Sequence, residues 1–471
     1  MRVVPVKSPG IAHSSYYVSS GGAAFVVDPR RDVEEYIRLA REECASIKYV
    51  FETHRNEDYV IGSLELKDAT GAEVSHSKET PLKYGDHSIS DGDRFHIGDL
   101  DVESLWTPGH TIDSMCYALY DLKGCDAPLA VFTGDTLFNG DVGRTDLPGE
   151  NIWENMSGSL YESLHDKVLP LGDHVIVYPG HTAGSICGSQ ISDRDVSTIG
   201  YEKRTNMQLS LSREDFIRNR LNNVMERPPY FRRMEEWNLN GASLLKDTKE
   251  PKMLTPIEFM EYSEKPDSFI LDTRQPDAFA ASHIPGSVSI WLSGATYYPG
   301  WVVDYDQQIL LVSERREDIP TVTSYLHRIG YDNVFGYLCP GIEAWRNSGK
   351  PLESSSPLHI HELQSLLEKG QVHVLDVRED HEYNSGHIKG SQSIYVGHLK
   401  DRLGEVPKGG LVCVTCGVGL RASIAASILK KEGYRVANLL GGMHAWNSAG
   451  LPVEVATKYR EGLRRTVVCP L

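Results

Sequence analysis

Short apolar runs separated by polar loops recur through the first half of the chain. The runs are rich in β-branched and aromatic residues, and each leads into a polar residue or a turn, which is typical of buried β-strands. They include residues 25–28, 49–51, 131–133 and 175–178, with helical stretches such as 33–44 and 153–169 between them. This alternation predicts a two-layered α/β domain over residues 1–240, with its functional groups at strand ends.

The second half of the chain repeats itself. Matching segments lie about 100 residues apart, which predicts two copies of one domain in tandem. They are 271–274 with 375–378, 282–286 with 386–390, and 344–345 with 445–446. In each copy apolar strands alternate with amphipathic helices, as at 321–329 and 423–432. We therefore expect each copy to be a mostly parallel sheet with helices on both faces.

These patterns divide the chain into three domains and a tail. We expect domains at 1–240, 241–355 and 356–456, followed by a basic tail at 457–471. A charged segment from 227 to 252 closes the first domain and links it to the repeats. Each domain is long enough to bury an apolar core of its own.

Composition narrows the choice of partner and compartment. The formal net charge of −17 over 471 residues argues against nucleic acid or a membrane surface as the main partner, because both reward clustered Lys and Arg. A diffusible small molecule is the expected substrate. The sequence shows neither a signal peptide nor a membrane span, so a cytoplasmic location is predicted. The eight cysteines lack the spacing of a disulfide framework and are expected to be reduced thiols.

Three short motifs place imidazole or carboxylate groups on loops that follow β-rich runs. They are Thr53-His54, Thr107-Pro-Gly-His110 and Thr133-Gly-Asp135. Two imidazoles and one carboxylate form the facial triad of non-haem Fe(II) oxygenases. Such a triad leaves roughly three coordination positions open for water, O2 and substrate. We therefore predict one Fe(2+) per chain, bound by His54, His110 and Asp135.

The first motif also has the outline of T-H-x-H-x-D-H, the metallo-β-lactamase signature that supplies ligands for two metals. Asn56 and Tyr59 occupy the positions of its second and third histidines, and both are poor ligands for a divalent metal. This argues against a dinuclear zinc hydrolase site. Asp58 and His181 are expected beside the metal rather than bound to it.

The first 235 residues or so resemble persulfide dioxygenases of the metallo-β-lactamase fold. The motifs that carry the resemblance are at 53–54, 107–111, 132–138, 143–146 and 178–181. The resemblance implies an αββα sandwich with iron held by the residues at His54, His110 and Asp135. It also implies oxidation of a thiol-bound persulfide by O2 to sulfite. Arg144 is a candidate anchor for the anionic substrate or for sulfite.

The second repeat contains Cys416-Gly-Val-Gly-Leu-Arg421 between an apolar strand and a helix. Backbone N–H groups around such a loop, together with the positive end of the helix, favour a thiolate. A nucleophilic sulfur in a ring of donors suits persulfide transfer. The loop and the motifs at 375–378, 386–388 and 441–446 resemble a rhodanese domain, which has a doubly wound α/β fold. Related phosphatases have a loop one residue longer, which admits phosphate, so the shorter loop here favours sulfur. Cys416 and Arg421 are therefore the predicted catalytic residues.

The first repeat lacks both of these predicted catalytic residues. Ser313 stands opposite Cys416, and Asp318 stands opposite Arg421, so this copy is predicted to be catalytically silent and structural. Another thiol, Cys187, lies just past His181. It could relay sulfur or position substrate near the iron, or it could be a small buried hydrophobe. Fusion enzymes of the CstB type resemble this chain in domain order and carry a cysteine at the same place.

The predicted function is sulfide detoxification. A low-molecular-weight persulfide, of glutathione, coenzyme A or a similar carrier, would be oxidised with O2 to sulfite. Persulfide on Cys416 would then convert sulfite to thiosulfate. A homo-oligomer is expected by family analogy. Two alternatives stay open: a zinc-dependent thioester hydrolase of the glyoxalase II type, and a non-catalytic sulfur sensor or scaffold suggested by Asn56, Tyr59 and Ser313.

Overall fold

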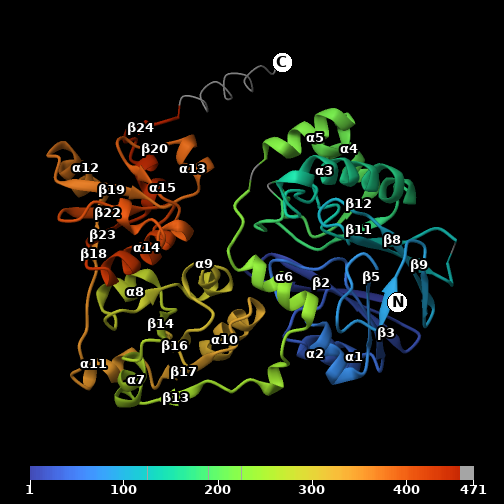
Figure 1. The fold of residues 1–471 in the computed structure, drawn as a ribbon, viewed down its shortest axis with the longest axis horizontal. Helices are drawn as coiled ribbons and strands as arrows, with labels where there is room; N and C mark the ends of the chain where they lie inside the picture. The colour runs from blue at the N-terminus through green and yellow to red at the C-terminus, as the bar shows by residue number, and fades with distance from the viewer. Residues whose placement is uncertain (125, 189, 224, 457–471) are drawn as a thin grey trace. The chain divides into compact units, whose positions relative to one another are not determined.

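A computed structural model describes residues 1–124, 126–188, 190–223 and 225–456. The predicted tail at 457–471 lies outside these residues. Contacts divide the chain into two units: residues 1–248 together with 327–332, and residues 249–326 together with the chain from 333 (Figure 1). Among the helices of the described residues, none combines the length and apolar character needed to cross a bilayer.

The first unit contains two six-stranded sheets, drawn from blue to green in Figure 1. The first sheet has the order β1-β2-β3-β4-β5-β6, formed by Arg2–Ser8, His13–Ser20, Ala23–Val27, Ser46–Phe51, Glu73–Ser77 and His87–Ile89. The second has the order β12-β11-β10-β9-β8-β7, formed by Ser197–Thr198, Ile176–Pro179, Ala130–Gly134, Met115–Asp121, Leu100–Trp106 and Arg94–Ile97. The four strands predicted from apolar runs correspond to β3, β4, β10 and β11.

The two sheets pack face to face and are covered by helices on their outer faces. One apolar cluster between the sheets joins Phe25 and Phe51 of the first sheet to Tyr117 and Phe132 of the second. Two further clusters lie on the outer faces. The helices are α1 (Glu34–Glu42), α2 (Ser63–Thr70), α3 (Trp153–Glu162), α4 (Ile199–Thr205), α5 (Arg213–Asn222) and α6 (Phe231–Asn240). The arrangement confirms the predicted αββα sandwich.

Two predictions for this unit are refined by the structure. The predicted helix at 153–169 is α3 followed by a π-helical segment at Ser163–Val168. The charged segment predicted to close the domain is not a plain linker, because it contains α6. Asn238 on α6 is buried, and its side-chain amide donates to the carbonyl oxygens of Asn56 and Tyr59 at 2.7 Å. This helix therefore fastens the loop that carries the first predicted metal ligand.

The second unit contains two five-stranded sheets with the same strand order, and all strands within each sheet are parallel. The first repeat has β13-β17-β16-β14-β15, formed by Lys252–Leu254, Val334–Leu338, Gln308–Val312, Ser268–Asp272 and Val288–Ser289. The second has β18-β23-β22-β19-β21, formed by Ser356–Leu358, Arg435–Leu439, Leu411–Thr415, Val372–Asp376 and Gln392–Ser393. A short antiparallel pair, β20 (His387–Ile388) and β24 (Val453–Glu454), completes the second repeat.

Matching helices accompany the two sheets. The first repeat has α7 (Pro256–Ser263), α8 (Pro276–Ala281), α9 (Pro299–Val302), α10 (Asp318–Arg328) and α11 (Ile342–Asn347). The second has α12 (Ile360–Glu368), α13 (Asp380–Ser385), α14 (Leu420–Lys431) and α15 (Gly442–Ser448). Both predicted amphipathic helices are present, as α10 and α14. The tandem repeat of parallel α/β domains predicted from the sequence is confirmed.

Candidate metal centre and sulfur-transfer loop

The three predicted metal ligands come together at strand ends in the first unit. His54 follows β4, His110 lies on the loop after β8, and Asp135 directly follows β10. All three side chains are buried. His110 Nε2 lies 3.5 Å from Asp135 Oδ2, and the imidazole rings of His54 and His110 are 5.1 Å apart between centroids. The convergence predicted from three separate motifs is therefore present in the fold.

Hydrogen bonds set the orientation of both imidazoles. His110 Nδ1 donates to the backbone carbonyl of Arg144 at 2.9 Å. His54 Nδ1 lies 2.9 Å from the Thr53 hydroxyl, whose own proton goes to Asp28. Because both Nδ1 atoms act as donors, each neutral ring presents the lone pair of Nε2 to the centre. Neither Nε2 atom has a hydrogen-bond partner, which is the state required of a metal ligand.

The carboxylate of Asp135 is held by a buried chain of charged groups. His181 Nδ1 contacts Asp135 Oδ1 at 2.8 Å, and His181 Nε2 contacts Asp58 Oδ2 at 2.8 Å. Burial alone would raise the pKa of Asp135, but the neighbouring histidines, His181 first, outweigh it and hold the pKa well below its ordinary value. Asp135 is thus a carboxylate, and the predicted position of Asp58 and His181 beside the ligands agrees with the geometry.

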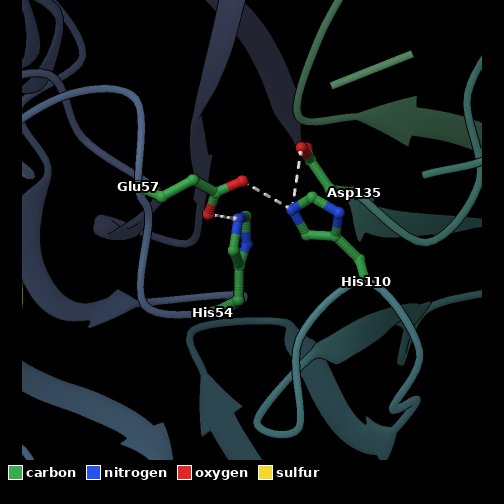
Figure 2. Close-up of side chains that lie close together, drawn as sticks. All are labelled: His54, Glu57, His110 and Asp135. Atoms are coloured by element: carbon green, nitrogen blue, oxygen red, sulfur yellow. Dashed lines mark ion pairs between the residues drawn. The ribbon is translucent and has the colours of Figure 1, made fainter. Parts of the chain in front are cut away.

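A fourth buried side chain belongs to the same cluster. Glu57 Oε1 lies 2.9 Å from His110 Nε2, and Glu57 Oε2 lies 3.7 Å from His54 Nε2. Figure 2 shows its carboxylate between the two imidazoles. The potential ligand atoms of His54, Glu57, His110 and Asp135 all lie within 4.8 Å of one another. Glu57 is not among the ligands predicted from the sequence; the signal that could have indicated it is an acidic residue inside a loop that lacks two of its usual histidines.

The donor set suits a single divalent ion. Two carboxylates and two imidazoles are buried together, and removing such charges from water costs several kcal/mol unless a cation compensates them. Burial lowers the pKa of His110, but Glu57 and Asp135 outweigh it and raise that pKa to about 9. The cluster therefore attracts positive charge. The unpartnered Nε2 atoms and Glu57 Oε2 point to a metal ion as its natural source.

The residues at the positions that would bind a second metal make other contacts instead. Both ring nitrogens of His181 are engaged by carboxylates. The Asn56 side chain donates to the His54 carbonyl at 3.2 Å, and the buried Tyr59 ring packs on His13 with centroids 4.2 Å apart. A group of Asp58, His181 and Cys187 remains close together, but its histidine has no free nitrogen. One metal per chain, rather than two, stays the prediction made from the sequence.

The structure gives Arg144 a role different from the predicted anion anchor. Its guanidinium pairs with Asp146 at 2.7 and 2.6 Å and donates to the carbonyl oxygens of Met225, Ile186 and Glu226. All five N–H groups are used in this way, so none is left for a substrate anion. Arg144 instead braces the loop whose carbonyl orients His110.

Cys187 lies beside the metal cluster, as its position after the His181 motif suggested. Its side chain is fully buried, and the thiol donates to Glu57 Oε1 at 3.8 Å. Burial is the main reason that the pKa of this thiol is raised well above its ordinary value, and the nearby carboxylates of Asp135, Asp58 and Glu57 raise it further. Whether Cys187 relays sulfur, positions substrate or only fills buried space stays a prediction.

In the second unit, Cys416 directly follows β22 and α14 begins four residues later. The Gly419 N–H donates to Cys416 Sγ at 3.1 Å. The loop is fastened from outside by Met443 N–H and His444 N–H, which donate to the carbonyl oxygens of Cys416 and Gly417. Gly442 permits this approach: its φ is +53°, and a Cβ there would lie 2.3 Å from the Cys416 carbonyl oxygen. The loop is thus a cradle around one buried sulfur.

Arg421 points from α14 toward a carboxylate on α13. Its two terminal nitrogens contact the two oxygens of Glu382 at 2.5 and 2.7 Å. Such a fork fixes the guanidinium in one place. A Cβ on Gly417 would lie 3.6 Å from Arg421 Nη2, so this charge sits against the loop. The catalytic role of Arg421 beside Cys416 stays a prediction. Glu382 is the residue that holds the Arg421 guanidinium in place.

The corresponding loop of the first repeat, residues 313–318, has no thiol. Ser313 directly follows β16, and its hydroxyl exchanges a hydrogen bond with Thr273 at 2.8 Å. Asp318, opposite Arg421, accepts from the side chain and backbone of Arg315. The alignment made from sequence alone agrees with these positions.

The first repeat nevertheless contacts the helix that begins at the Cys416 loop. The Ser423 hydroxyl of α14 donates to Ser289 Oγ at 2.9 Å, and the Ser289 N–H donates to Ser427 Oγ at 3.1 Å. Trp301 of α9 packs edge-on against Tyr395, with ring centroids 5.2 Å apart. A Cβ on Gly397 would lie 2.3 Å from the Trp301 ring. The first repeat is thus a packing partner of the repeat that carries Cys416.

Comparisons with known proteins agree with this architecture. The Metallo-beta-lactamase superfamily model matches residues 9–181, and the Rhodanese-like domain model matches residues 255–348 and 359–449. The mitochondrial hydroxyacylglutathione hydrolase of Saccharomyces cerevisiae (strain ATCC 204508 / S288c) is 31% identical over 220 residues, 43% of this chain and 74% of that protein. The mitochondrial persulfide dioxygenase ETHE1 of Bos taurus is 28% identical over 196 residues, 41% of this chain and 70% of that protein.

Among solved structures, a metallo-beta-lactamase from Staphylococcus aureus subsp. aureus COL has a TM-score of 0.64 and 28% identity. The match covers 72% of this chain and 98% of that one. The chain belongs to the metallo-β-lactamase superfamily. More particularly, it is a metallo-β-lactamase domain followed by two rhodanese-like domains, as the sequence motifs predicted.

Proposed function

We propose that this chain is an enzyme of sulfur metabolism that joins persulfide oxidation to sulfur transfer. The first domain would use one Fe(II) to oxidise a low-molecular-weight persulfide: RSSH + O2 + H2O → RSH + SO3²⁻ + 2 H⁺. The observation that carries this proposal is the buried convergence of His54, His110 and Asp135 with two unpartnered Nε2 atoms. The similarity to a persulfide dioxygenase supports the choice of substrate.

The chain's own residues have definable tasks in the first step. When bound, iron supplies O2 activation that no side chain offers. Thr53 and the Arg144 carbonyl keep the protons of His54 and His110 on Nδ1. His181 holds Asp135 as an oriented carboxylate. The site is buried, so few water molecules compete with the persulfide anion.

Cys416 would perform the second step. Its thiolate attacks the sulfane sulfur of RSSH, the S–S bond breaks, and RSH leaves while Cys416 keeps the sulfur as a persulfide. Sulfite then attacks that sulfur, forming the new S–S bond of thiosulfate and returning the Cys416 thiolate. The N–H of Gly419, which already points at Sγ at 3.1 Å, would stabilise the negative sulfur.

Oxygen uptake by the iron-loaded protein tests the first step. The wild type should consume O2 with glutathione or coenzyme A persulfide and release sulfite or thiosulfate. The His110→Ala variant should lose O2 uptake, while Cys416→Ser should keep it and lose thiosulfate. Absence of O2 uptake by iron-loaded wild type with either persulfide would refute the oxygenase assignment. Cys413→Ala is the control, since Cys413 is a buried thiol of β22 that belongs to the apolar core.

A zinc-dependent thioester hydrolase is the second candidate, favoured by the similarity to a hydroxyacylglutathione hydrolase. The replaced positions Asn56 and Tyr59 and the fully engaged His181 weigh against the two-metal centre of that chemistry. Metal analysis of the purified protein, together with a hydroxyacylglutathione cleavage assay, separates the candidates. Zinc with thioester cleavage would reverse the choice. The thiol carrier, the oligomeric state and the cytoplasmic location stay predictions.

A further inference from the structure

Glu57 occupies a place that the three-ligand description of the metal centre does not explain. It lies three residues after His54 on the same loop and is 1% exposed. Its two carboxylate oxygens face the Nε2 atoms of the two predicted histidine ligands, at 2.9 and 3.7 Å (Figure 2). A buried carboxylate is retained at such a place only when something compensates its charge.

An ion pair between His110 Nε2 and Glu57 Oε1 at 2.9 Å accounts for only part of this contact. The Nε2 atoms of His54 and His110 and the Oε2 atom of Glu57 are buried without a hydrogen-bond partner. Both imidazoles use Nδ1 as donor, so in the neutral form each ring turns the lone pair of Nε2 toward the carboxylate. Lone pairs that converge within 4.8 Å of one another repel, and a cation among them removes that repulsion.

We propose that Glu57 is a fourth protein ligand, which makes the centre a two-histidine, two-carboxylate site. This inference rests on the divalent metal of the proposed function but not on its O2 chemistry. Two carboxylates balance the charge of a divalent cation, and four protein ligands leave roughly two coordination positions open instead of three.

The surroundings hold Glu57 in the orientation that a ligand needs. The Cys187 thiol donates to Oε1 at 3.8 Å. The Cys187 backbone is itself fixed, because its N–H donates to Ser185 Oγ and its carbonyl accepts from Arg144 N–H. Cys187 is therefore a positioning residue for Glu57 in this proposal.

Metal affinity measured without O2 or persulfide is the direct test. The full chain and its Glu57→Gln variant are titrated anaerobically with Co²⁺ against a chelating indicator, and the visible spectrum of bound Co²⁺ reports the ligand set. We expect Glu57→Gln to weaken Co²⁺ binding by about 10- to 100-fold or more, since even residues that only orient ligands have effects of this size. The Co²⁺ bands should also shift.

Glu52→Gln is the matched control for this experiment. Glu52 is another buried glutamate of the same strand-to-loop region, but its carboxylate accepts from the Tyr84 hydroxyl and stands outside the metal cluster. The Co²⁺ affinity and the Co²⁺ spectrum of the Glu52→Gln variant should equal those of the wild type. Unchanged affinity and spectrum in Glu57→Gln would overturn the proposal and make Glu57 an ion-pair partner of His110.

A second measurement uses the wild-type protein, so it does not depend on the folding of a variant. In a crystal structure of the wild type grown with Zn²⁺ or Co²⁺, a Glu57 oxygen at about 2.1 Å from the ion supports the proposal. A Glu57 oxygen beyond bonding distance from a bound ion overturns it. Metal bound through Glu57 without O2 uptake would instead refute the oxygenase function and leave the ligand assignment standing.

Discussion

The two rhodanese-like repeats keep the same internal fastenings and differ at their loops. In the first, Arg274 pairs with Asp272 and donates to the Ser282 carbonyl; in the second, Arg378 does the same with Asp376 and Gly386. The histidines that follow stack on Phe279 and Tyr383 in the same manner. These contacts hold the fold, so their presence in both copies says nothing about activity.

The loops show what activity requires beyond the fold. Ser313 exchanges a hydrogen bond with Thr273, whereas the matching pair in the second repeat is Cys416 and the apolar Val377. Cys416 Sγ therefore accepts a hydrogen bond from the Gly419 N–H, and no side-chain hydroxyl stands at the position of Thr273. In the proposed function, two repeats with the same strand order thus separate the scaffold from sulfur transfer, which depends on the loop. Four predictions test this comparison.

The largest effect is expected from exchanging the two loop residues. Cys416→Ser should lower thiosulfate formation by at least about 1,000-fold, because the nucleophile is lost. Adding Ser313→Cys to that variant should restore nothing, since the first loop has Asp318 where the second has Arg421. Thiosulfate is measured from persulfide and sulfite supplied together. Recovery of activity in the double variant would break the comparison.

A methyl group at Gly442 should disturb the cradle without touching the nucleophile. The new Cβ would lie 2.3 Å from the Cys416 carbonyl oxygen, at a φ of +53°. We expect a loss of about 1–3 kcal/mol in stability and a matching fall in transfer rate. Thermal unfolding and transfer kinetics measure both. Gly450→Ala is the control, because φ is +67° there but the space is open; equal effects would show backbone strain alone.

The Arg421–Glu382 pair should make the second repeat sensitive to acid. Burial on its own would raise the pKa of Glu382, but the Arg421 guanidinium outweighs it and holds the pKa below its ordinary value. A carboxyl whose pKa is depressed by folding stabilises the protein above its unfolded pKa, and this contribution is lost as pH falls through the folded pKa. Stability should therefore fall below about pH 4.5.

Denaturant unfolding at several pH values between 3 and 7 measures this effect, and the Glu382→Gln variant should show a flatter acid limb. The pair is partly exposed, so the difference should be about 1 kcal/mol or less. The first repeat has Ala278 and Asp318 at the matching positions and lacks the pair. Identical acid limbs in wild type and variant would remove this difference between the repeats.

The smallest effect is expected from the contact between the repeats. Ser289→Ala removes the hydroxyl that accepts from Ser423 on α14 and should cost about 1 kcal/mol. It should leave O2 uptake unchanged and lower the transfer rate slightly. Ser293→Ala is the control, because its hydroxyl accepts only from Trp291 of the same repeat. An equal effect on transfer in both variants would argue that the first repeat merely adds general stability.

Much of this molecule could be predicted from local sequence. The strands β3, β4, β10 and β11, the 104-residue repeat and the Cys416 loop were all evident, because each depends on a few adjacent residues. The assignment of Asn56 and Tyr59 to positions outside the metal cluster also followed from residue type. Arg144 did not, because a guanidinium can serve an anion or a set of carbonyls equally well, and only its surroundings choose.

The sequence by itself determined the order of domains, the three motifs that converge on the metal centre, and which repeat carries the thiol. Only the tertiary structure decided that Glu57 faces the imidazoles, that His181 is engaged on both nitrogens and that Cys187 touches Glu57. The physical reason is the separation along the chain of the residues that each feature depends on. Strand and loop patterns arise between neighbours in the chain, whereas a buried charge is satisfied by partners that folding brings from 50 to 130 positions away.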